Sequence, residues 1–216
     1  MKDNRHKRKF KDFVIATSMN LDSPKILEFG VSERGMSTEL FIELCEKKNG
    51  KLISVDINNN TKKFKSKNWH FINSRDDNFN EIEKVIKGET FDIIYLDTIH
   101  KANHVEKILF YYYEKLKEGG YFFIDDTSWL PYTKKREKNN FSIEVNNSET
   151  FDKLLQIHNV NHESFDLDFS FVGTGVARIT KLSTKKLVMS KKIPTRKYSP
   201  LNFMRKIYLN LFKRNA

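Results

Sequence analysis

The fold of this 216-residue chain is decided by two stretches near its N-terminus: ILEFGVSERGMS, residues 26–37, and ISVD, residues 53–56. A short apolar strand runs into a loop that holds Gly30 and Gly35. A helix follows, and a second apolar strand ends at Asp56. Glycines let the backbone approach a ligand closely, and the acid can accept hydrogen bonds from a ribose diol. The pattern is typical of a βαβ unit that binds a nucleoside.

Strands and helices continue to alternate after this unit. The run at 91–96 is almost entirely apolar, which predicts a strand covered on both faces. We expect strands at 26–30, 51–55, 69–72, 91–96 and 121–124, and helices at 35–48, 80–87, 105–117 and near 148–158. Such alternation predicts an α/β fold with a doubly wound, mostly parallel, Rossmann-like sheet. Residues 165–172 and 175–181 are expected to add an antiparallel hairpin at its edge.

The charge of the chain is concentrated in its C-terminal tail. Of the 39 Lys and Arg residues, 11 lie in 181–216, where there is no Asp or Glu; the remaining 28 bases balance 28 acids. Apolar residues recur at helical spacing after Ser199-Pro200, which predicts a basic amphipathic helix. We therefore divide the chain into a basic lead-in at 1–24, one domain at 25–182, and a basic tail at 183–216.

Composition also narrows the cellular setting. The single cysteine, Cys45, excludes an internal disulfide and a thiolate zinc cluster. No stretch approaches the ~20 apolar residues of a membrane-spanning helix, and the charged N-terminus does not resemble a secretory signal. We expect a cytoplasmic protein. Its tail suits contact with the inner face of a membrane, and docking of the tail helix on its own domain or on a second subunit stays open. A homo-oligomer stays open, and a nucleic-acid partner is not expected.

Acidic residues follow several of the predicted strands. Ligands bind at the carboxyl ends of the strands in open α/β sheets, so these residues should converge. They are Glu28, Asp56, Asp97, Asp125 and Asp126, with Gly30 beside them. Neighbouring carboxylates repel unless a cation intervenes, and hard divalent ions prefer such oxygen ligands. The sequence thus predicts Mg²⁺, or another hard divalent cation, at Asp97, Asp125 and Asp126.

A histidine accompanies the predicted metal ligands. His100 lies three residues after Asp97 and has a side chain suited to take a proton from a substrate hydroxyl. Simpler roles stay open: Asp125 and Asp126 as a turn cap, His100 as a solvated loop residue, and His104 as a structural residue or pocket wall.

Four segments carry a family resemblance: Ile26–Ser37, Ser54–Ile57, Phe91–His104 and Lys117–Thr127. They resemble the successive motifs of class I S-adenosylmethionine-dependent methyltransferases. Within that superfamily, LDTIH at 96–100 and the later GGY and DDT are similar to the metal-dependent O-methyltransferase branch. That branch includes catechol, caffeoyl-CoA and macrolide-sugar enzymes and a cephalosporin-hydroxylase-like group. The resemblance covers roughly residues 25–182.

The resemblance implies a role for each candidate residue. Asp56 would bind the ribose, and Asp97 would border the cofactor. Glu28, Gly30, Gly35 and Ser37 would line its methionine and ribose part, and Ser74 and Asp76 would approach the adenine. Asp97, Asp125 and Asp126 would match the metal ligands, and His100 the general base.

The resulting hypothesis is an S-adenosylmethionine-dependent, Mg²⁺-assisted O-methyltransferase. Its acceptor would be a hydroxyl of a sugar or another small polar molecule, including a glycan. Three alternatives stay open: a metal-independent methyltransferase, a non-catalytic module that holds a membrane or RNA through the tail, and an NAD-binding oxidoreductase suggested by the first motif alone.

Overall fold

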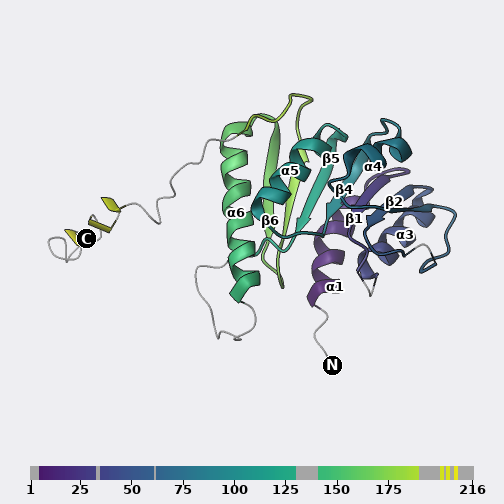
Figure 1. Ribbon diagram of the computed structural model, residues 1–216, viewed down its shortest axis with the longest axis horizontal. Helices are drawn as coiled ribbons and strands as arrows, with labels where there is room; N and C mark the ends of the chain where they lie inside the picture. The colour runs from purple at the N-terminus through teal and green to yellow at the C-terminus, as the bar shows by residue number, and fades with distance from the viewer. Residues whose placement is uncertain are drawn as a thin grey trace.

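The computed structural model describes residues 5–32, 35–60, 62–129 and 141–189, with residues 200, 201, 203, 204, 207 and 208 of the tail. A seven-stranded sheet runs through this described part (Figure 1). Its strands are β1 (Lys25–Phe29), β2 (Lys51–Asp56), β3 (Trp69–Asn73), β4 (Phe91–Leu96), β5 (Leu116–Asp125), β6 (Phe165–Ser170) and β7 (Val176–Lys181). The order is β3-β2-β1-β4-β5-β7-β6. Strands β1 to β5 are parallel, and β7 is antiparallel to both β5 and β6. The predicted doubly wound sheet and its edge hairpin are confirmed.

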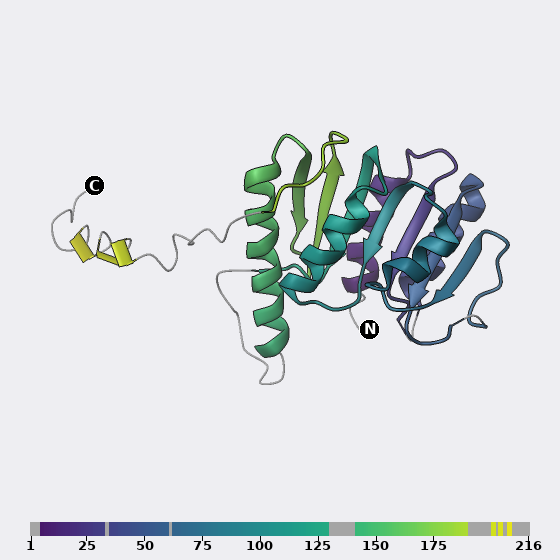
Figure 2. The ribbon, with the colours of Figure 1, turned by 45° about the horizontal axis from the view of Figure 1, so that its top comes forward.

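Helices cover both faces of the sheet (Figure 2). They are α1 (Arg5–Lys9), the π-helix η1 (Phe10–Ile15), α2 (Ala16–Ser18), α3 (Met36–Lys48), α4 (Phe79–Ile86), α5 (Ala102–Tyr113) and α6 (Phe141–Asn161). One apolar cluster joins α4, α5 and α6 to the sheet. A second cluster joins η1 and α3 to the opposite face.

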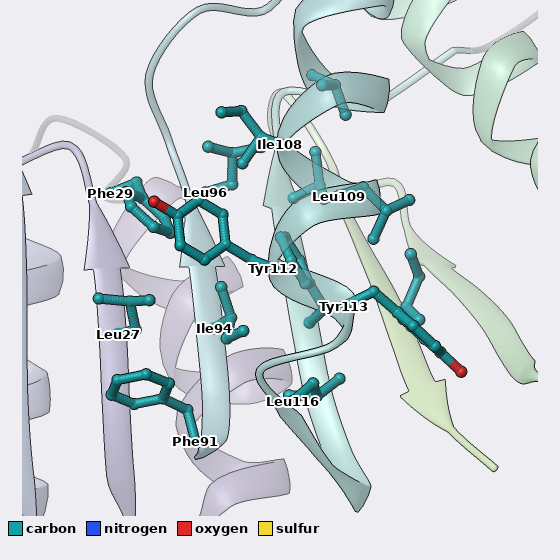
Figure 3. Packing of buried hydrophobic residues seen from close by; sticks show 14 of the residues in the cluster. Leu27, Phe29, Phe91, Ile94, Leu96, Ile108, Leu109, Tyr112, Tyr113 and Leu116 are labelled. Atoms are coloured by element: carbon teal, nitrogen blue, oxygen red, sulfur yellow. The ribbon is translucent and has the colours of Figure 1, made fainter. Parts of the chain in front are cut away.

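The central strands divide their side chains between these two clusters. Leu27 and Phe29 of β1 and Ile94 of β4 pack toward α5, as Figure 3 shows. Ile26 and Ile93 alternate with them and pack toward η1 and α3. Successive residues of a strand point to opposite faces, so a strand with apolar neighbours on both sides needs an unbroken apolar run.

The structure differs from the prediction where β5 begins. We expected a helix as far as residue 117, but α5 ends at Tyr113 and β5 starts at Leu116. Leu116 is buried and pairs with Phe91 of β4. Burial and strand pairing override the helical spacing of Leu116, and Gly119, with φ +75°, lies within the strand instead of ending a helix.

The N-terminal helical segment packs against the domain. Phe10 and Val14 are each 1% exposed. The ring of Phe10 meets those of Phe41 and Tyr95 edge to face, with centroids 5.0 and 5.2 Å apart. The lead-in that the sequence separated from the domain at residue 24 therefore contributes to its core.

The predicted tail helix falls largely outside the described residues. Those of its residues that are described are helical and exposed: Pro200, Leu201, Phe203, Met204, Ile207 and Tyr208. Within the described part of the chain, every helix is too short or too polar to cross a membrane.

Candidate active site

A cavity of about 240 Å³ opens at the carboxyl ends of β1, β2 and β4. The register explains the position, because Phe29 lies beside both Val55 and Leu96, and all three strands end at one level. Five predicted residues line the cavity: Gly30, Asp56, Ser74, Asp76 and Asp97. Others that line it were not predicted, among them Ile57, Asn58, Thr98 and Ile99.

Two glycines of the loop between β1 and α3 pack tightly against neighbouring residues. Gly30 has φ +97°, and a Cβ there would lie 2.0 Å from the carbonyl oxygen of Asp97. Gly35 has φ +61° and precedes α3, and a Cβ there would lie 2.4 Å from the ring of Phe64. Neither position can accept a larger residue without displacing the backbone or a ring.

The carboxylate of Asp56 is held in place at the rim of the cavity. Its Oδ2 accepts a hydrogen bond from the backbone N–H of Val31 at 2.6 Å. Its Oδ1 accepts one from the N–H of Asn58 at 2.7 Å. These bonds fix the orientation in which the acid meets a ligand, as the predicted ribose contact requires.

Asp76 is more constrained than the sequence suggested. The residue is 6% exposed, and its Oδ2 lies 2.7 Å from His104 Nε2 and accepts a hydrogen bond from the Thr98 hydroxyl. The Tyr112 hydroxyl donates to its backbone carbonyl at 3.2 Å. His104 therefore supports the cavity wall, one of the two roles left open for it. A sequence spacing of 28 residues gave no local signal for this pairing.

Glu28 lies behind the cavity wall. The residue is fully buried, and its oxygens accept hydrogen bonds from the hydroxyls of Ser37, Thr38 and Ser54 at 2.7, 2.9 and 2.6 Å. Burial raises its pKa to about 7, against the lowering effect of the three hydroxyls. Glu28 and Ser37 thus join β1, β2 and the start of α3. The direct cofactor contacts predicted for them remain predictions.

The carboxylates after β4 and β5 surround His100. Its Nε2 lies 3.5 Å from Asp97 Oδ1 and 3.5 Å from Asp126 Oδ2. Burial raises the pKa of Asp97 well above its ordinary range, and the charges of Asp125 and Asp126 raise it further. The structure therefore places His100, the predicted base, beside two of the three predicted metal ligands.

Asp125 is bonded to side chains other than His100. One carboxylate oxygen pairs with the ammonium group of Lys9, and the other accepts a hydrogen bond from the Tyr95 hydroxyl at 3.0 Å. Neither Lys9 nor Tyr95 was predicted as a site residue: nothing near Lys9 in sequence marks it, and Tyr95 lies within the apolar run of β4, which predicted a buried strand residue.

The carboxylates suit a hard divalent cation only in part. Asp97 and Asp126 offer oxygen donors of the right chemistry, but Asp125 is already bonded to Lys9 and Tyr95. Within the described ranges, no three His, Cys, Asp or Glu side chains form a group that could hold a metal ion. The metal site of Asp97, Asp125 and Asp126 remains a prediction.

We predict that Glu28 makes folding less favourable as the pH rises. Its pKa is about 7 in the folded protein and 4.5 in the unfolded reference, so only the unfolded state ionises between these values. Stability should fall over that window by up to about 3 kcal/mol, and Glu28→Gln should flatten the fall. Urea unfolding from pH 4.5 to 7.5 measures it. Glu89→Gln is the control, because Lys51 and Lys25 lower the pKa of Glu89, so Glu89 is ionised in both states over most of this window and its replacement should leave the slope nearly unchanged. Parallel curves for Glu28→Gln and the unmodified chain would contradict the prediction.

Comparison with known proteins agrees with this arrangement. Residues 27–127 match the family model described as a methyltransferase domain. No curated protein sequence matches the chain.

Solved structures share the fold at low sequence identity. The MycE methyltransferase of the mycinamycin biosynthetic pathway, solved with Mg, SAH and mycinamycin VI, is 20% identical with a TM-score of 0.56. The match covers 88% of this chain and 50% of that one, so this chain spans about half the length of MycE. A Staphylococcus aureus protein assigned as a caffeoyl-CoA O-methyltransferase is 15% identical with a TM-score of 0.58, covering 84% and 85% of the two chains. SAH-bound Podospora anserina methyltransferase PaMTH1 is 17% identical with a TM-score of 0.56, covering 74% and 72%.

At these identities the structural likeness establishes the fold alone. Residues 27–127 of the chain match a methyltransferase domain, and the fold is that of solved methyltransferases such as MycE and PaMTH1.

Proposed function

We propose that this protein transfers the methyl group of S-adenosylmethionine to a hydroxyl of a small polar acceptor such as a sugar. One observation carries the proposal. The cavity bounded by Gly30 and Asp56 reaches Asp97, and the carboxylate of Asp97 lies 3.5 Å from His100 Nε2. A nucleoside site and a candidate base therefore share one residue.

The residues that line the cavity suit the chemistry of the cofactor. Asp56 would accept hydrogen bonds from the ribose hydroxyls. Gly30 has no side chain, so the cofactor could approach the backbone closely there. Ser74 and Asp76, at the far wall, would border the adenine. S-adenosylmethionine, when bound, supplies a methyl group already activated on a sulfonium.

The protein then has two tasks, orientation of the acceptor and removal of its proton. Orientation provides much of the acceleration in such a transfer. His100 would accept the proton of the hydroxyl at Nε2. The carboxylates of Asp97 and Asp126, each 3.5 Å away, would stabilise the imidazolium that results.

We include a divalent cation in the proposal. Asp97 and Asp126 would hold Mg²⁺ or a similar hard ion, which would lower the pKa of the acceptor hydroxyl. The structural relative MycE was solved with Mg, SAH and mycinamycin VI, which supports a metal and a small-molecule acceptor. The carboxylates of Asp125 and Asp126 repel that of Asp97, and a nearby positive charge would offset this repulsion.

We predict that Gly30→Ala weakens SAH binding at least tenfold, because the new Cβ would meet the Asp97 carbonyl at 2.0 Å. Gly119→Ala is the matched control. Its φ is also positive, at +75°, but a Cβ there would have no atom within 4 Å. Both variants should lose about 1–2 kcal/mol of stability through backbone strain, Gly30→Ala should lose more through the contact with the Asp97 carbonyl, and only Gly30→Ala should lose affinity in calorimetry. Equal SAH affinity of the two variants would contradict the proposed cofactor site.

We predict that His100→Asn lowers the rate of methyl transfer about 10²- to 10⁴-fold, the usual contribution of a general base, while SAH affinity stays within about twofold. Radiolabelled S-adenosylmethionine and a panel of glycosides, sugar nucleotides and catechols measure the transfer. The control is His70→Asn, on an exposed position of β3. An equal effect of the two substitutions would remove His100 from the chemistry, and label appearing only on nitrogen would refute O-methylation.

A separate observation favours membrane contact through the tail. Leu201, Phe203 and Met204 are 68%, 66% and 62% exposed, and residues 181–216 carry 11 basic and no acidic residues. Apolar side chains at helical positions among many bases suit an anionic membrane surface. We propose that the tail brings the enzyme to such a surface.

We predict that the full chain sediments with vesicles containing phosphatidylglycerol and that a chain ending at residue 189 does not. The cut leaves intact the hydrogen bond from the Val188 N–H to Asn161. A second variant replaces Leu201, Phe203 and Met204 with serine, keeps every charge and should bind more weakly. Equal sedimentation of all three proteins, or equal binding to phosphatidylcholine alone, would contradict membrane contact through the tail.

A further inference from the structure

Lys9, at the end of α1, is a buried lysine in the carboxylate cluster. Its side chain is 2% exposed. The ammonium group pairs with Asp125 and donates to the Thr174 hydroxyl at 3.1 Å and the Gly175 carbonyl at 3.2 Å. An ammonium has three N–H donors, and each has an acceptor here. Lys9 therefore links α1 to the end of β5 and to the turn between β6 and β7.

The contacts of Asp125 leave little room for a metal ion. Besides Lys9, its Oδ1 accepts a hydrogen bond from the backbone N–H of Asp126 at 2.9 Å. Its Oδ2 accepts the bond from the Tyr95 hydroxyl. A cation that bound Asp125 would have to displace Lys9 or Tyr95, which is 2% exposed. Asp97 and Asp126 instead face His100 on the open side.

The surrounding packing holds Lys9 in this position. The next residue, Phe10, is locked between the rings of Phe41 and Tyr95. Eight residues after Lys9, the Thr17 hydroxyl accepts a hydrogen bond from Arg178 of β7 at 3.0 Å. Withdrawal of the ammonium would leave the buried Asp125 carboxylate without a positive counter-charge, which would be strongly unfavourable.

We propose that Lys9 serves as a built-in cation for Asp125, so that a divalent ion at this site is held by Asp97 and Asp126 without Asp125, and only weakly. The positive charge that three neighbouring carboxylates require comes partly from the polypeptide itself. Lys9 thereby sets the metal affinity as a positioning residue and does not touch the substrate. The inference rests on the proposed function only for the identity of the metal-binding carboxylates.

Mn²⁺ binding to the full-length protein, measured by electron paramagnetic resonance, tests the proposal. Lys9→Met removes the charge at nearly constant size and frees Asp125 as a ligand, so Mn²⁺ affinity should rise on the order of tenfold or more, as an added carboxylate ligand commonly causes. The double variant Lys9→Met/Asp125→Asn should lose the gain. Lys153→Met is the control, because Lys153 forms a comparable ion pair with Glu106 on the outer helices. It should leave Mn²⁺ affinity unchanged.

A second comparison does not depend on the folding of Lys9→Met. Asp125→Asn keeps a side-chain oxygen for Lys9 and should change Mn²⁺ affinity less than twofold, whereas Asp97→Asn and Asp126→Asn should weaken it at least tenfold. Loss of affinity in Asp125→Asn equal to that in Asp97→Asn would overturn the proposal. So would a folded Lys9→Met that gains no affinity, including when the unmodified protein binds no Mn²⁺. Failure of the proposed function would appear separately, as absent SAH binding or methyl transfer.

Discussion

The common level at which the parallel strands end is the constraint on which the rest of the structure depends. Phe29 of β1 lies beside Val55 and Leu96, and Leu96 lies beside Ile124. Two backbone hydrogen bonds continue this alignment past the strands, from Gly30 N–H to Val55 and from Asp97 N–H to Phe29. A slip of one residue in any pair would move a site residue to the other face of the sheet. The buried apolar runs of β1 and β4 make such a slip unfavourable, so the core specifies the site.

Gathering acids at one edge creates an electrostatic problem, which the protein meets in three ways. Glu28 is surrounded by hydroxyls, and Asp56 accepts backbone N–H bonds. Asp125 is bonded to a lysine and a tyrosine. Each arrangement fixes a side chain while offsetting part of its desolvation. Asp97, whose pKa remains raised, is the carboxylate beside the candidate base.

Most of the sheet could be predicted because its signals are local. The apolar run at 91–96 coincides with β4, and the segments at 165–172 and 175–181 contain the two antiparallel edge strands. The end of α5 was misplaced because Leu116 satisfies helical spacing and strand pairing equally well in sequence, and only its partner Phe91 decides between them. The site was predicted where residues follow strand ends, as for Asp56 and Asp97. Lys9 could not be predicted, because its partners lie 116 to 166 residues away.

That separation has a consequence for biosynthesis. Lys9 leaves the ribosome 165 residues before Thr174, which is followed by Gly175 and by β7, the strand that lies between β5 and β6. Contacts between distant parts of a chain form late and slowly. Until then the nascent protein exposes an unpaired lysine on its first helix and an unpaired edge on β5, a surface to which chaperones bind. Helix α1 is thus made well before the residues that complete its final environment.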